Sequence, residues 1–118
     1  MSRRIFHLTT PDVWRTAAES GELRPASLEA EGFAHLSFDD QLRGTLALHF
    51  AQARFAGSQV LALELVQSSL GAELVVEPSR GGELFPHLYR GVRPHDVLRV
   101  FPLVRDPSGQ WSLPDGVP

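Results

Sequence analysis

Two stretches of similar pattern decide the fold of this chain: residues 32–38, GFAHLSF, and residues 82–90, GELFPHLYR. Apolar and other side chains alternate in both, as in a β-strand, where every second side chain shares a face. One face of each stretch is apolar, and the other combines an aromatic residue with a histidine, which is His35 in the first stretch and His87 in the second. Residues 5–8, IFHL, place His7 on a mixed face in the same way. Three predicted strands therefore each present one histidine.

Further strands and two main helices are predicted outside these stretches. Residues 59–66, QVLALELV, are apolar on both faces and predict a strand that is buried on both sides. Pro86 favours an edge strand or a bulge for residues 84–89. The remaining strands are expected at residues 4–8, 33–38, 73–77 and 97–104, and the helices at residues 11–20, with Thr10 as the cap, and 41–54. Helices confined to the N-terminal half predict an α+β fold with a mainly antiparallel sheet.

The length of 118 residues predicts a single domain over residues 1–118. Within it, residues 105–118 are expected to form a weak hairpin and a frayed tail, because they are rich in proline and glycine. The hydrophobic fraction of 42% is ordinary for a globular protein, so the chain can build its own core.

Composition excludes several kinds of site. Cysteine is absent, which rules out disulfides, thiolate metal sites and a cysteine nucleophile. No segment has the length of a signal peptide or a membrane span, so we expect a cytoplasmic protein with no membrane partner. A net charge of -3 with scattered arginines, apart from Arg90 and Arg93 as a small basic patch, argues against a nucleic-acid partner. We expect a monomer or a weak homodimer.

The three strand histidines are the candidate site. A cleft lined by His7, His35 and His87 would combine apolar walls with a few polar groups, as small-molecule sites do. The alternative is that each histidine is structural and bonded to the main chain. With Glu83 the set could ligate a metal, but the spacing matches no zinc motif, and we predict no metal site. His49 is interpreted as structural, and His95 as a surface or capping group.

Four blocks of the sequence resemble a small bacterial family, domain-of-unknown-function family 952 (DUF952). The resemblance runs from about residue 5 to residue 103, and the blocks EGFAHLS and GGELFPHLY are the most specific. The blocks are IFHLTT at residues 5–10, SGELRP at 20–25, EGFAHLS at 31–37 and GGELFPHLY at 81–89.

That family is similar to the ADP-ribosyltransferase fold, a split antiparallel sheet with an NAD cleft between its halves. The resemblance implies that His7 holds the ribose of NAD, and that His35 takes the place of a tyrosine that stacks on nicotinamide. It also implies that Glu83 or His87 fills the role of the catalytic glutamate. In transferases of this fold the residue at the position of Leu8 is glycine. The other residues implied to contact NAD are Leu8, Thr9, Arg24, Ser37, Phe85 and Tyr89.

Three functions follow from the resemblance and the histidines. The first is an enzyme that binds NAD or a related nucleotide and transfers or hydrolyses ADP-ribose. The second is a module that binds a nucleotide or another small metabolite without chemistry. The third is an enzyme of the RNA 2'-phosphotransferase type, which needs several arginines for phosphate; we match none of them in this sequence.

Overall fold

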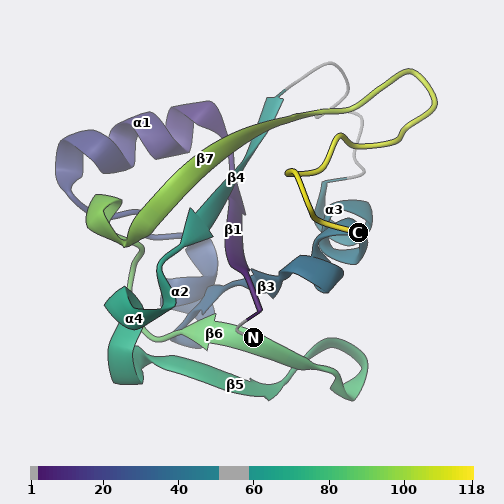
Figure 1. The fold of residues 1–118 in the computed structure, drawn as a ribbon. Coiled ribbons are helices and arrows are strands. Elements are labelled where there is room, and N and C mark those ends of the chain that lie inside the picture. The colour runs from purple at the N-terminus through teal and green to yellow at the C-terminus, as the bar shows by residue number, and fades with distance from the viewer. Residues whose placement is uncertain (1–2, 51–58) are drawn as a thin grey trace.

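The computed structural model describes residues 3–50 and 59–118 and contains two antiparallel sheets. The larger sheet has the strand order β3-β1-β4-β7. Its strands are β1 (Ile5–Thr9), β3 (Ser37–Phe38), β4 (Gln59–Leu65) and β7 (Val97–Val104). The smaller sheet has the order β2-β6-β5 and lies below the larger one in Figure 1. Its strands are β2 (Ala34–His35), β5 (Leu74–Pro78) and β6 (Leu84–Leu88). The predicted α+β class with antiparallel sheets is confirmed.

The chain passes from the smaller sheet to the larger one at Leu36. We predicted one strand over residues 33–38, and this was wrong, because β2 ends at His35 and β3 begins at Ser37. Between them the buried Leu36 donates its N–H to the carbonyl of Pro86, at an N···O distance of 3.1 Å. Both sheets are therefore tied to a single short segment.

Strand β6 is the central strand of the smaller sheet, although it contains Pro86. The expectation of an edge strand or a bulge was therefore wrong. A strand residue points its N–H and C=O to the same side, and the Pro86 carbonyl is directed at Leu36. The side of Pro86 that lacks an N–H therefore faces Leu36, where β2 has just ended. Pro86 removes only the bond that would have continued the β2–β6 ladder, and β5 still pairs with β6 along its whole length.

The four α-helices of the described chain are short, and most lie in the N-terminal half. They are α1 (Pro11–Ser20), α2 (Ala26–Glu31), α3 (Leu42–His49) and α4 (Gln67–Leu70). The single-turn segments are η1 (Asp39–Gln41), η3 (Gly71–Glu73), η4 (Arg80–Gly82) and η5 (Pro94–Asp96). Thr10 occupies the N-cap of α1, but its side chain makes no capping hydrogen bond, contrary to our expectation. The predicted end of the second main helix, at residue 54, lies outside the described residues.

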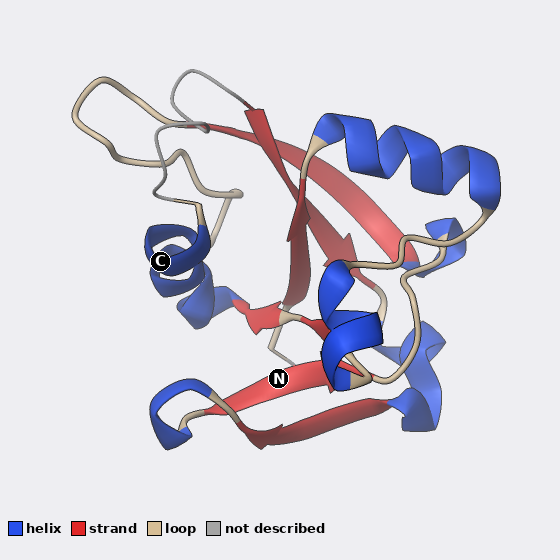
Figure 2. Ribbon diagram, turned by 180° about the vertical axis from the view of Figure 1, so that it is seen from behind, coloured by secondary structure: helices blue, strands red, loops and turns tan. Residues whose placement is uncertain are grey.

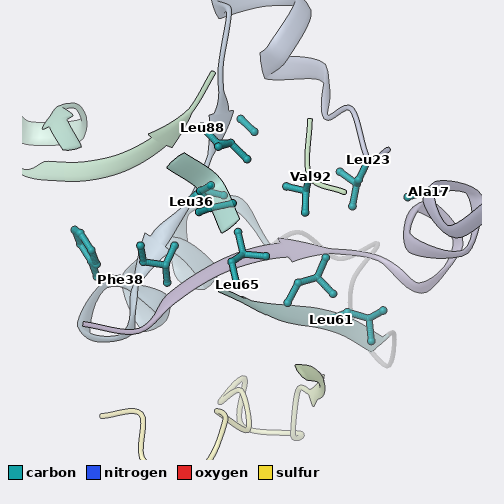
Figure 3. Packing of buried hydrophobic residues seen from close by; sticks show 12 residues of the cluster. Ala17, Leu23, Leu36, Phe38, Leu61, Leu65, Leu88 and Val92 are labelled. Atoms are coloured by element: carbon teal, nitrogen blue, oxygen red, sulfur yellow. The ribbon is translucent and has the colours of Figure 1, made fainter. Parts of the chain in front are cut away.

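The larger sheet buries side chains on both of its faces. On one face, Leu61, Leu63 and Leu65 of β4 belong to a cluster that includes residues of α1 and of the smaller sheet (Figure 3). On the other face, Val60 and Ala62 pack with residues of α3 and of the C-terminal segment. The prediction that β4 is buried on both sides is confirmed.

The C-terminal segment covers the second of these clusters. We expected residues 105–118 to form a weak hairpin and then fray. Arg105 and Trp111 do form an isolated bridge. After it Pro114 is buried, and Leu113 and Val117 pack against the core, while most other residues of the segment are exposed. The Arg4 guanidinium donates to the carbonyl of Asp115 at 2.6 Å and holds the end of the chain in place.

A buried ion pair joins the start of β7 to the loop after β6. Arg90 donates to both carboxylate oxygens of Asp96, at 2.8 and 3.1 Å, and Asp96 is fully buried. Burial alone would raise the pKa of Asp96, but hydrogen bonds from Arg90, Ser69 and the Arg93 N–H lower it to about 2. Arg90 is thus a structural residue rather than part of the basic patch that we expected.

We predict that Asp96→Asn destabilises the protein by about 3 kcal/mol, because it removes the buried one of the two carboxylates that pair with Arg90; the half-exposed Glu73, 3.0 Å from the Arg90 Nε, remains. The contribution of Asp96 is complete above its ordinary pKa of 3.8, and it is lost as the pH falls towards about 2. Urea unfolding at pH 7 measures the difference. The exposed Asp115→Asn serves as the control and should change the stability little. Equal stability of the two variants would contradict this prediction.

Candidate functional site

A cavity of about 840 Å³ opens where the two sheets meet the helices α1, α2 and α3. This volume is in the range of sites for small organic ligands, roughly 300–1,000 Å³. Figure 2 shows α2 and α3 on either side of β1. Residues of both helices line the cavity. The polar side chains of the wall are His7, Thr9, Thr10, Ser27, Glu31, His35, Ser37, Thr45, His49 and Ser79.

His7 is the buried imidazole of this wall. Its Nδ1 lies 2.9 Å from the main-chain carbonyl oxygen of His35. A carbonyl oxygen can only accept a hydrogen bond, so Nδ1 carries the proton, and Nε2 of the neutral ring is an acceptor. Burial lowers the pKa of His7, while the bond to the His35 carbonyl partly opposes this effect. His7 is therefore neutral at pH 7 and offers a lone pair at Nε2.

His35 forms a pair with Glu31. The His35 Nε2 lies 2.8 Å from a carboxylate oxygen of Glu31, and both side chains are about half exposed. Glu31 is the last residue of α2, and Gly32 follows it with a φ of 90°, a left-handed conformation that glycine adopts without strain. This turn returns the chain into β2, so that the carboxylate and the imidazole four residues later lie side by side.

The structure does not bring His87 to the cavity wall. His87 pairs with His35 in the sheet register, but its ring stacks on Phe33, with centroids 4.0 Å apart. Its Nδ1 lies 2.8 Å from the carboxylate of Glu77, which also accepts a hydrogen bond from Tyr89. The His87 Nε2 is buried and has no partner within the described chain. The predicted cleft of three histidines is therefore formed by two of them.

Of the other residues that the resemblance implied, some line the cavity and some do not. Leu8, Thr9, Ser37 and Phe85 line the cavity, and Ser37 shares a hydrogen bond of 2.9 Å with Thr45.

Three of the predicted residues are not in the wall. Arg24 is exposed and bonds to Glu22, and Tyr89 bonds to Glu77. Glu83 is exposed, and it accepts a hydrogen bond of 3.1 Å from the side-chain amide of Gln41. Glu83 thus lies immediately before β6 and is not part of the cavity wall.

Sequence reasoning missed the contributions of α2 and α3 to the wall. We interpreted His49 as structural, but it lines the cavity together with Thr45 and Leu48 of the same helix. Glu31 was also missed, although it begins the block EGFAHLS, which carried the resemblance most specifically. The signal available in the sequence was the carboxylate of Glu31, four residues before His35.

The comparisons with known proteins agree with the blocks noted in the sequence. The model of the family described as "Protein of unknown function (DUF952)" matches residues 8–100, which is most of the chain. The chain belongs to the DUF952 family. The match includes His35, Glu31 and most of the other residues of the cavity wall. No curated protein matches the chain.

This DUF952 protein is also similar to solved structures of one bacterial protein, CC0527 from Caulobacter crescentus. Its crystal structure is 33% identical with a TM-score of 0.79, and the match covers 92% of this chain and 93% of that one. The crystal structure of a double mutant is 32% identical with the same coverage and TM-score. The solution structure is 33% identical with a TM-score of 0.74, covering 90% of this chain and 89% of that one. The fold described above is therefore one that experiment has seen in a related sequence.

Two further findings concern the residues that the structure describes. No group of three His, Asp or Glu side chains among residues 3–50 and 59–118 is placed to hold a metal ion. No helix in the same part of the chain is long and apolar enough to cross a membrane.

We predict that neutral His7 makes the stability depend on pH. Because the folded state lowers the pKa of His7, the unfolded state binds the proton more readily, and stability is lost as the pH falls below about 6.5. His7→Gln can still donate to the His35 carbonyl and does not titrate. Thermal unfolding from pH 8 to pH 5 should therefore show a smaller loss of stability in this variant. His49→Gln, at an exposed position, is the control, and the prediction fails if its slope and that of His7→Gln are the same.

Proposed function

We propose that this protein binds NAD or a related nucleotide in the cavity and transfers or hydrolyses ADP-ribose. The observation that carries the proposal is the neutral imidazole of His7 at the cavity wall, with its Nε2 left as an acceptor. A ribose hydroxyl is a donor that suits this acceptor. The hydroxyls of Thr9, Ser37 and Thr45 in the same wall supply further donors and acceptors for a sugar.

The resemblance to the ADP-ribosyltransferase fold supports the same proposal. There, a histidine of the first strand holds the ribose, and an aromatic residue of the next strand stacks on nicotinamide. His7 lies in β1 and His35 in β2, and both line the cavity. The two strands belong to different antiparallel sheets, and the bond from His7 to the His35 carbonyl joins them beside the cavity.

The reaction breaks the bond between the ribose carbon and the ring nitrogen of nicotinamide. The bonding electron pair leaves with nicotinamide, and the ribose carbon develops positive charge. Water, or the hydroxyl of an acceptor molecule, then adds to that carbon and loses a proton. A neutral imidazole and a carboxylate near the developing charge stabilise it, because their lone pairs are oriented before the bond breaks.

A module that binds the nucleotide without chemistry is the second candidate. It is favoured by the positions of His87 and Glu83, the two residues proposed for the catalytic glutamate's role, because neither lines the cavity. The RNA 2'-phosphotransferase reaction has less support. None of the described residues in the wall is an arginine that could hold an RNA phosphate.

Thermal unfolding in the presence of ligands tests the proposal. We expect NAD or ADP-ribose at 100 times its dissociation constant to stabilise the protein by about 2.7 kcal/mol, a shift of several degrees. His7→Gln should weaken that binding by about fivefold, since it replaces the ring acceptor that contacts the ribose. Release of nicotinamide from NAD, measured on the same samples, separates the enzyme from the binding module.

The matched control for this experiment is His95→Gln, an exposed histidine outside the cavity wall. It should bind as the unchanged protein does. Nicotinamide and a 2'-phosphorylated RNA complete the set of ligands. If the RNA alone stabilises the protein, the phosphotransferase alternative replaces the proposal, and if no ligand shifts the unfolding temperature, the proposed function is wrong.

A further inference from the structure

The cavity wall has an uneven distribution of charge. Among its described residues Glu31 is the one carboxylate, and none is arginine or lysine. The remaining polar groups are hydroxyls and imidazoles, of which His7 is neutral. An anionic group placed in this part of the cavity would meet one negative charge and no fixed positive one, whereas a cationic group would be attracted.

The other nearby carboxylates are engaged elsewhere. Glu83 accepts a hydrogen bond from Gln41, and Glu77 accepts from His87 and Tyr89. Neither Glu83 nor Glu77 lines the cavity. A ligand in the cavity therefore meets the carboxylate of Glu31 and not those of Glu77 or Glu83.

The geometry leaves part of Glu31 open to a ligand. One carboxylate oxygen accepts the hydrogen bond from His35 Nε2, and the side chain remains about half exposed. In the described part of the chain, the second oxygen accepts no hydrogen bond. His35 thus holds the carboxylate against the wall while leaving one oxygen available.

We propose that Glu31, positioned by His35, is the anionic group of this site and selects a ribose-linked ring that carries a positive charge. A pyridinium N-riboside has this chemistry: its hydroxyls suit His7, and its cationic ring suits Glu31. The inference rests on the proposed function, since it places the ribosyl half of the ligand in the cavity.

The oxidised and reduced forms of nicotinamide riboside test the selection, because they have nearly the same shape and differ in the positive charge of the ring. Calorimetric titration should show that the protein binds the oxidised form about fivefold more tightly. Glu31→Gln should bind the two forms equally, and Glu31→Asp, which restores the charge, should keep part of the preference. Glu29→Gln, an exposed glutamate of the same helix that is not in the wall, should keep all of it.

Each outcome has a definite meaning. If the oxidised form binds and Glu31→Gln keeps the full preference while remaining folded by circular dichroism, the role of Glu31 is wrong and the proposed function stands. If the unchanged protein binds the reduced riboside as tightly as the oxidised one, the electrostatic selection by Glu31 is overturned, while the proposed function stands. If neither riboside, nor nicotinamide mononucleotide, nor NAD binds, both proposals are wrong.

Discussion

The hydrogen bond from the ring of His7 to the carbonyl of His35 is the interaction on which the site depends. It joins β1 of the larger sheet to β2 of the smaller one, immediately before the chain crosses between them at Leu36. The same bond determines which nitrogen of His7 carries the proton. A structural constraint between two sheets therefore also sets the chemistry of the cavity wall, because it leaves Nε2 as an acceptor.

Two carboxylate–histidine pairs lie near one another and differ in what they face. Glu31 and His35 are half exposed in the cavity wall, whereas His87 is buried beside Glu77 and covered by Phe33. The same kind of carboxylate–histidine pair therefore occurs in two different environments. The first pair can meet a ligand, and the second lies in an aromatic contact between β2 and β6. This difference is why we propose that Glu31, and not Glu77 of β5, meets the positive charge of the ligand.

Several features could be predicted from local sequence alone. The strands β1, β4, β5, β6 and β7 fall within about one residue of the predicted ranges, and the burial of β4 on both faces follows from its continuous apolar run. The alternation of side chains also placed His7 and His35 on the non-apolar faces of their strands. The division of residues 33–38 between two sheets was not predicted, since both halves have the same alternating pattern and only the pairing partners differ. For the same reason Pro86 was misplaced at an edge.

What the sequence by itself determined is the family, the α+β class, the positions of most strands, and two of the histidines in the cavity wall. These depend on short-range pattern, which the pleat of a strand and the turn of a helix impose on neighbouring residues. The tertiary structure decided that His87 is not part of the wall, that Glu31 and His49 join it, and that Trp111, Leu113 and Val117 of the C-terminal segment pack on the core. Those outcomes depend on how distant segments approach one another, and the crossing at Leu36 sets that approach for the two sheets that carry the histidines.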